Sequence, residues 1–225
     1  MLIVCHSPKG GSGCTVTAAT LALLLAPRHR GGGHVVDLAG DLSATLGVPE
    51  SADHHPRDVN SALQLHTCSH RDRLGTVITD WDRVVSLVGS LSGPVVVDAG
   101  TAILDERLVA AADVHLTVVR PCYLALRRAT TQKPAGSRAP DGVVVVNEPN
   151  RALGPKDVET VLRVPVRAVV PFDASISRAV DAGLLSHRIP KVAEEGLAEL
   201  VGSLSGSADE GPVQGLGPMQ SPRVA

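Results

Sequence analysis

A glycine-rich segment near the N-terminus constrains the fold of this chain more than any other feature. Residues 7–17 read Ser-Pro-Lys-Gly-Gly-Ser-Gly-Cys-Thr-Val-Thr, between an apolar run at Leu2–His6 and an Ala/Leu-rich stretch at Thr15–Ala26. The first run predicts a strand and the second a helix. Strand, glycine turn and helix in this order direct backbone N–H groups and a helix N-terminus at one point, which favours an anion. The segment therefore predicts a phosphate-binding loop.

The loop departs from the usual phosphate-binding pattern at one position. That pattern ends in Gly-Lys-Ser/Thr, whereas this chain has Gly13, Cys14 and Thr15, and it carries Lys9 at the front of the loop. We expect the Thr15 hydroxyl to face Mg²⁺ and the exchange at Cys14 to weaken charge stabilisation of phosphate. Two interpretations of Cys14 stay open. It is either a small neutral replacement or a thiol that ionises at the helix N-terminus and makes the site redox-sensitive.

Strand-like and helix-like segments alternate along the rest of the chain. Further strands are predicted at His34–Asp37, Thr76–Thr79, Pro94–Asp98, Val114–Val119, Val143–Asn147 and Val166–Val170, and further helices at Trp81–Leu91, Leu104–Ala112, Tyr123–Thr131, Lys156–Leu162, Ser175–Ala182 and Val192–Leu200. Continuous valine runs are typical of strands buried on both faces of a parallel sheet. The order predicts an α/β fold with a doubly wound, mostly parallel sheet between two layers of helices.

Composition sets the expected domain boundaries. Residues 1–202 are expected to form one domain, and the Gly/Ser/Pro-rich residues 203–225 a disordered tail. The tail contains two Gly-Pro pairs and no amphipathic basic helix, so direct membrane binding is not expected. The polar stretch 49–56 is expected to be a loop.

Charge and cysteine usage narrow the functional class. The formal net charge is −2, which argues against a basic coat for nucleic acid. The four cysteines include no Cys-x-x-Cys pair, and no run of about 18 apolar residues occurs. We therefore expect a cytoplasmic protein without a zinc site.

Polar residues end three of the predicted strands. Asp37, Asp98 and Asn147 each follow a run of valines, and such strand ends face the ligand crevice of a doubly wound sheet. From the residues alone, Asp98 is either a metal-shell ligand or a strand-end cap, and Asn147 either a ligand contact or a turn residue. For Asp41, a helix-capping role also stays open.

Histidines suggest a second, weaker site. His66 and His70 have helical i, i+4 spacing, with Asp72 near, and His54 and His55 are adjacent. No third ligand is evident, so we interpret the region as a solvated face rather than a metal site.

The stretch from Lys9 to Thr15 resembles the deviant phosphate loop of the ParA/MinD superfamily of ATPases, and the resemblance extends over roughly residues 1–200. It implies ATP or ADP with Mg²⁺ as ligands and an ATP-dependent homodimer, in which Lys9 reaches the partner's nucleotide. The implied cofactor-binding residues are Lys9, Gly10, Gly11, Ser12, Gly13, Cys14, Thr15, Thr17, Asn147, Pro171 and Asp173.

The family's two switch segments also have counterparts. Residues 35–42 resemble the first switch, whose second aspartate orients the attacking water. Ala39 occupies the usual spacing, so Asp37 and Asp41 are both candidates for this catalytic role, with Lys9. Residues 95–100 resemble the second switch, which implies that Asp98 and Thr15 hold Mg²⁺. Asn147 would read the adenine edge.

Residues 120–127 and 181–190 are most similar to the CpaE/TadZ-like branch, which is associated with pilus assembly and polar positioning. The resemblance implies a dimerising positional switch, with ATP hydrolysis slow or impaired by Cys14, in partitioning, polar localisation or pilus-type assembly. One alternative is a non-hydrolysing scaffold that binds a protein partner. Another is a nonspecific DNA-binding partition protein that uses Arg127 and Arg128, together with Lys133 and Arg138.

Overall fold

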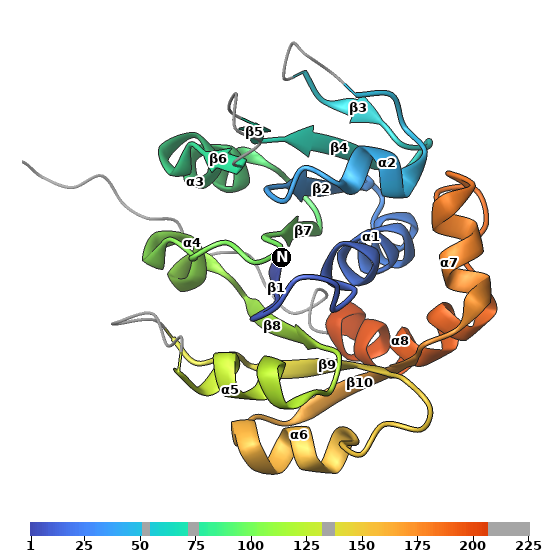
Figure 1. The fold of residues 1–225 in the computed structure, drawn as a ribbon. Coiled ribbons are helices and arrows are strands. Elements are labelled where there is room, and N and C mark those ends of the chain that lie inside the picture. The colour runs from blue at the N-terminus through green and yellow to red at the C-terminus, as the bar shows by residue number, and fades with distance from the viewer. Residues whose placement is uncertain (51–54, 72–76, 132–137, 207–225) are drawn as a thin grey trace, which may run out of the picture.

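Eight strands form one sheet, with helices on both faces (Figure 1). The computed structural model describes residues 1–50, 55–71, 77–131 and 138–206. The strands lie in the order β10-β9-β8-β1-β7-β2-β4-β3, and every neighbouring pair is parallel except β3 with β4. The predicted doubly wound α/β fold is thereby confirmed.

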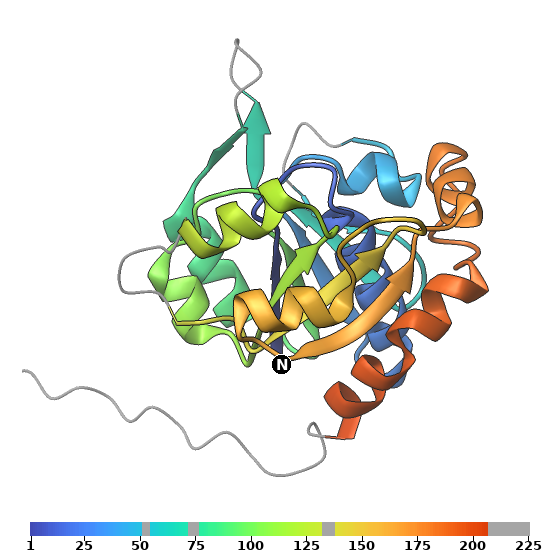
Figure 2. The same ribbon diagram turned by 60° about the horizontal axis from the view of Figure 1, so that its bottom comes forward.

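The elements have the following bounds. The sheet contains β1 (Leu2–His6), β2 (Gly33–Asp37), β3 (Arg57–Asp58), β4 (Leu63–Thr67), β7 (Val95–Asp98), β8 (Val114–Val119), β9 (Gly142–Asn147) and β10 (Val166–Pro171). The helices are α1 (Cys14–Leu25), α2 (Leu42–Leu46), α3 (Trp81–Ser90), α4 (Glu106–Ala111), α5 (Tyr123–Thr131), α6 (Pro155–Leu162), α7 (Ala174–Asp181) and α8 (Lys191–Gly206). A separate antiparallel pair, β5 (Ser69–Arg71) and β6 (Val77–Thr79), stands out from the body of the domain in Figure 2.

Alternate residues of the central strands face two different layers of helices. Ile3 and Val35 pack on the side of α1 and α8, whereas Val4 and Val36 pack on the side of α3 and α4. The buried apolar side chains of the described residues are all Ala, Val, Leu, Ile or Cys, as the scarcity of aromatic residues requires. No helix in the described part of the chain is long and apolar enough to span a membrane.

Helix α1 lies at the centre of the larger apolar layer. Nine of its twelve residues are buried, and it contacts strands β7, β1 and β2 as well as helices α8 and α2. A helix that is apolar all round must be covered on every side, and these neighbours supply the cover. The glycine loop is thus attached to a rigid helix.

Several elements were not predicted from the sequence. Strand β4 alternates Leu63 and Leu65 with polar residues, so it lacks the valine run that marked the other strands. Helix α2 has only five residues. Helix α8 continues to Gly206, beyond the expected boundary at residue 202. The remaining tail and residues 51–54 lie outside the described residues.

The interpretation of the histidine region as a solvated helical face is wrong for His66. His66 lies in strand β4, is only 7% exposed, and its Nε2 is 3.1 Å from Nδ1 of His34. His70 lies in β5, and Asp72 lies outside the described residues. Within the ranges that the structure describes, no group of three or more His, Cys, Asp or Glu side chains could hold a metal ion.

A second histidine pair lies on the opposite side of the sheet centre. His115 in β8 is 4% exposed, and its Nε2 is 2.9 Å from Nδ1 of His6. Burial lowers the pKa of all four histidines, to about 3 for His6 and about 4 for His66. Both pairs are therefore neutral in the folded protein.

These pairs predict loss of stability in mild acid. The unfolded chain takes up protons below a pH of about 6.5, where the folded His66 stays neutral, so stability falls as pH falls. Between about pH 7.5 and 5, His66→Gln should reduce this loss by about 1–2 kcal/mol relative to the unsubstituted protein. Urea unfolding at the two pH values measures the free energy of unfolding of each protein. His187→Gln, at an exposed site, is the control. The same loss of unfolding free energy in the unsubstituted protein and in both variants would contradict the prediction.

Candidate functional site

The glycine loop follows β1 and turns directly into α1. Gly11 and Gly13 have left-handed φ values of 73° and 85°, which glycine adopts without the cost that a Cβ imposes. Gly13 is the N-cap of α1, so the first N–H groups of the helix open toward the loop. The hydroxyls of Ser7 and Ser12 donate to the Lys9 carbonyl at 2.8 and 2.7 Å. The loop therefore has a shape suited to an anion.

Two cavities meet at this loop, and Gly11, Ser12 and Gly13 line both of them. The outer cavity, of about 660 Å³, is also lined by Lys9, Gly10, Cys14, Thr15, Asp41 and Val77, among others. The inner cavity, of about 220 Å³, is also lined by Thr17, Arg120, Pro171, Phe172, Asp173 and Val180, among others. Most of the sequence-predicted site residues thus lie around two adjoining cavities.

Asp98 ends β7 in register with Cys5 of β1 and is fully buried. Its Oδ1 accepts the Gly100 N–H at 3.0 Å, while Oδ2 has no hydrogen-bond partner among the described residues. Burial raises the pKa of this carboxyl, and the neighbouring Thr15 hydroxyl, Gly100 N–H and Cys14 thiol oppose that shift. An unpartnered buried carboxylate oxygen near a threonine hydroxyl fits an oxygen-ligated cation such as Mg²⁺.

The two candidate switch aspartates differ in their surroundings. Asp37 is 1% exposed, and its carboxylate accepts N–H groups of Ala39, Gly40 and Leu42 at 3.0, 2.6 and 3.0 Å. Burial nevertheless raises the pKa of Asp37 to about 6. Asp41 stands at the N-cap of α2 without a side-chain capping bond, is exposed, and lines the outer cavity. Asp37 therefore shapes the segment, and Asp41 is the one that reaches the cavity.

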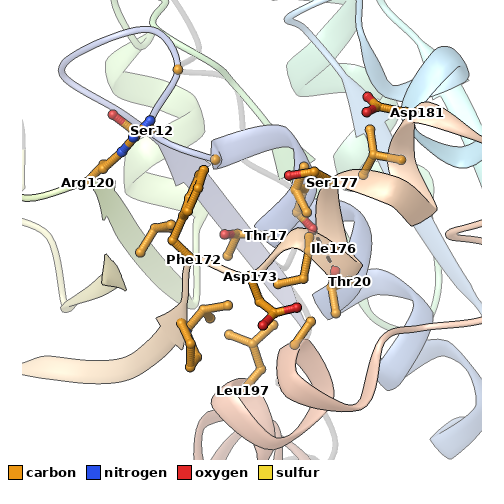
Figure 3. Close-up of a pocket in the computed structure, with 18 residues that line it drawn as sticks. Ser12, Thr17, Thr20, Arg120, Phe172, Asp173, Ile176, Ser177, Asp181 and Leu197 are labelled. Atoms are coloured by element: carbon orange, nitrogen blue, oxygen red, sulfur yellow. Dashed lines mark hydrogen bonds between the residues drawn. The ribbon is translucent and has the colours of Figure 1, made fainter. Parts of the chain in front are cut away.

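Figure 3 shows the inner cavity, whose walls are mostly apolar side chains from α1, β10, α7 and α8. Asp173 caps α7 by accepting the Ser175 N–H at 2.7 Å. Asn147 pairs in register with Pro171, but Val146 lines the cavity in its place. Successive residues of a strand face opposite sides, so Asn147 points away from the α1 layer.

Cys14 is only 7% exposed and packs in the apolar cluster around α1. Burial raises the pKa of its thiol well above the usual value, and the Asp98 charge adds to this. The hypothesis that Cys14 ionises at the helix N-terminus is therefore wrong. Desolvation outweighs the helix dipole here.

The basic cluster proposed for DNA is smaller than the sequence suggested. Arg127 and Arg128 are exposed on α5. Arg138 instead donates to both Asp141 oxygens, at 2.7 and 2.8 Å, and to the Ala112 carbonyl. Lys133 lies outside the described residues.

A close backbone contact joins the segment that carries Asp41 to the wall of the inner cavity. Gly47 caps α2 with φ 69°, and a Cβ there would clash with the carbonyl oxygen of Gly183, at the end of α7. Helix α7 supplies Ile176 and Val180 to the cavity wall. The segment that carries Asp41 is therefore held directly against that wall.

Several residues that line these cavities received no site role from the sequence, among them Arg120, Phe172 and Val77. Arg120 and Phe172 line the inner cavity, with the Arg120 guanidinium carbon 4.6 Å from the Phe172 ring centroid. Arg120 directly follows a predicted strand and Phe172 comes two residues after another, and these positions were the available signal. Val77 of β6 lines the outer cavity and carries no comparable signal.

A phosphate-type loop between β1 and α1, at the carboxyl edge of a doubly wound sheet, defines an α/β domain of the P-loop class. No family model and no curated protein matches the chain. Solved structures do match it along almost its whole length.

Three of these structures illustrate the similarity. A ParA family ATPase from Chlorobium tepidum TLS is 18% identical, with a TM-score of 0.70 over 90% of this chain and 98% of its own. MinD from Pyrococcus horikoshii OT3, complexed with Mg-ADP, is 20% identical, with a TM-score of 0.68 over 92% of this chain and 97% of its own. A chain of the MinC:MinD complex of Aquifex aeolicus is 17% identical, with a TM-score of 0.66 over 96% of this chain and 99% of its own. The chain therefore has the fold of the ParA and MinD ATPases.

The contact between Gly47 and Gly183 predicts a position-specific effect on stability. Gly47→Ala should destabilise the protein by about 2 kcal/mol, because alanine is strained at this φ and its methyl group meets backbone. Gly89→Ala in α3, where a Cβ meets nothing within 4 Å, is the control and should stabilise by about 0.5–1 kcal/mol. Chemical unfolding measures both. Equal effects at the two glycines would contradict the assignment.

Burial also predicts the order in which the cysteines react. In the folded protein Cys122, which is partly exposed, should be alkylated before the buried Cys5, Cys14 and Cys68. Mass spectrometry after brief iodoacetamide treatment identifies the labelled thiol, and Cys122→Ser should remove the fast phase. Rapid labelling of Cys14 would contradict its buried, protonated state.

Proposed function

We propose that this chain binds ATP or ADP with Mg²⁺ at the glycine loop. The observation that carries the proposal is the buried Asp98 carboxylate, whose Oδ2 has no partner among the described residues and which neighbours Thr15 beside the loop. Burying such an oxygen without a donor is costly. A bound cation would offset that cost, and the loop offers an anion site for the phosphates of a nucleotide that carries this cation.

Each residue then has a role. The backbone N–H groups of residues 10–13 would hold phosphate, and Thr15 and Asp98 would hold Mg²⁺, which offsets phosphate charge when bound. Thr17, Pro171 and Asp173 would border the base in the inner cavity. Asp41 would orient the attacking water. Asn147 follows Val146, which lines the inner cavity, and would contact the base only from the end of β9.

Cys14 should slow hydrolysis more than it weakens binding. Phosphoryl transfer depends on charge stabilisation of the transition state, and one lost charge-assisted contact weakens binding by about tenfold to a hundredfold. Lys9 is the lysine that remains in the outer cavity, and it would act across a homodimer. Exposed Ile103 and Tyr123, which follow β7 and β8, give this edge apolar surface for such a contact.

We infer a dimerising positional switch, in partitioning, polar localisation or pilus-type assembly as in the CpaE/TadZ-like branch. The ParA and MinD folds of the similar structures support this class of role. Nucleotide-dependent assembly, rather than fast turnover, is its expected output.

A second candidate is a non-hydrolysing scaffold for a protein partner. Two observations favour it. Cys14 lines the outer cavity but is only 7% exposed and brings no positive charge to it, and Ala39 stands at the usual position of the water-orienting aspartate.

Calorimetric titration of ATP and ADP, with and without Mg²⁺, separates the candidates. The proposal predicts Mg²⁺-dependent binding by the unsubstituted chain, and binding about tenfold or more tighter by Cys14→Lys. Thr15→Ala is the control that should lose the Mg²⁺ dependence in both backgrounds.

Two results would contradict the proposal. If neither the unsubstituted chain nor Cys14→Lys binds nucleotide, the site is not a nucleotide site. If only Cys14→Lys binds, the scaffold is the correct function.

A further inference from the structure

Three adjacent strands bring a charged cluster to the mouth of the inner cavity. Arg120 directly follows β8, Glu148 follows β9 and Phe172 follows β10, and these strands are neighbours in the sheet. Arg120 donates from Nε and Nη2 to one Glu148 oxygen at 2.8 and 2.6 Å. Its guanidinium also stacks over the Phe172 ring at 4.6 Å. Glu148 and Phe172, which follow two different strands, thus hold the Arg120 side chain in place.

The cluster has a surplus of positive charge. Arg151 donates to the same Glu148 oxygen at 2.6 Å, so two arginines share one carboxylate. The pKa of Glu148 is lowered by both arginines, which keeps it ionised. Nη1 of Arg120 makes no hydrogen bond to any residue that the structure describes. One net positive charge and a free donor group therefore remain.

This charge lies beside the glycine loop. Arg120 lines the inner cavity together with Gly11, Ser12 and Gly13, and Figure 3 shows its side chain pointing toward Ser12. It is the arginine of that lining, whereas Lys9 is the lysine of the outer cavity. The same lining holds two carboxylates: Asp173, which accepts the Ser175 N–H in capping α7, and Asp181, which Figure 3 shows on the side away from Arg120.

We propose that Arg120 supplies, within one subunit, the positive charge toward nucleotide phosphate that Cys14 does not provide. The proposal rests on the nucleotide binding proposed above. Arginine suits this position, because its planar fork can donate to Glu148 on one edge and keep a second edge for phosphate. Glu148 and Phe172 are positioning residues that hold the fork toward the loop.

A purely structural role for Arg120 makes a different prediction. If the guanidinium only packs on Phe172 or on a bound base, its planar shape matters and its charge does not. Lysine keeps the charge and loses the plane, and glutamine keeps part of the length and loses the charge. The two substitutions therefore distinguish the roles.

The test is calorimetric titration of Mg²⁺ and ADP into the full chain and its variants. Arg120→Gln should bind ADP about tenfold to a hundredfold more weakly, and Arg120→Lys should keep most of the affinity. Arg151→Gln is the matched control. Arg151 shares Glu148 with Arg120 but lines neither cavity, so the ADP affinity of Arg151→Gln should differ from that of the unsubstituted chain by less than about threefold. Adding Cys14→Lys to Arg120→Gln should restore most of the loss.

If Arg120→Gln does not fold, Arg120→His gives the same comparison in one protein. Its ADP affinity relative to the unsubstituted chain should be higher at about pH 5.5, where an exposed histidine is charged, than at about pH 8. Unchanged affinity in Arg120→Gln, or equal losses for glutamine and lysine, would overturn this inference and leave nucleotide binding intact. Absence of ADP binding by the unsubstituted chain would overturn both.

Discussion

Backbone hydrogen bonds between the ends of three adjacent strands hold the site together. The Ser7 N–H donates to the Gly100 carbonyl at 2.7 Å, Ala99 N–H to Cys5 at 2.9 Å, and Leu38 N–H to Asp98 at 2.9 Å. These bonds link the loops after β1, β2 and β7 into one surface. The same sheet edge therefore positions the glycine loop, the Asp98 carboxylate and the segment that carries Asp41. A displacement of one of these loops would strain its hydrogen bonds to the next.

The fold was predictable because its strongest signals are local. Valine runs mark β7 and β9, and glycines mark the turn into α1. Strand β4 and helix α2 were not predictable, since one is half polar and the other a single turn whose fold depends on three bonds to Asp37. Long-range packing, not local propensity, determines such elements.

The site was predictable in part. Strand ends identified Asp98, but not that one of its oxygens lacks a donor. Sequence spacing left Asp37 and Asp41 as equal candidates, because it does not show that three backbone N–H groups bind the buried Asp37 carboxylate or that Asp41 lines the outer cavity. Both interpretations of Cys14 stayed open in the sequence, because only the structure shows that its thiol is buried and that burial opposes its ionisation. Arg120 became a candidate once the sheet order placed it beside Glu148 and Phe172.

The slow phosphoryl transfer that we propose rests on the distribution of charge around the glycine loop. The loop has no lysine at position 14, and the buried carboxylates of Asp37 and Asp98 stand at the ends of the nearby strands β2 and β7. Any nucleotide would therefore depend on Mg²⁺, on Lys9 and on Arg120 for neutralisation. Under the proposed function, such a site would favour nucleotide binding and assembly over turnover.

The most direct test of the central claim is amide chemical-shift mapping with ADP and Mg²⁺, because it detects weak binding and locates it. The account predicts that the largest shifts cluster at the backbone of Gly10–Thr15 and around Phe172–Ser175, and that they require Mg²⁺. Absence of shifts at millimolar nucleotide, or shifts scattered away from the glycine loop, would contradict it.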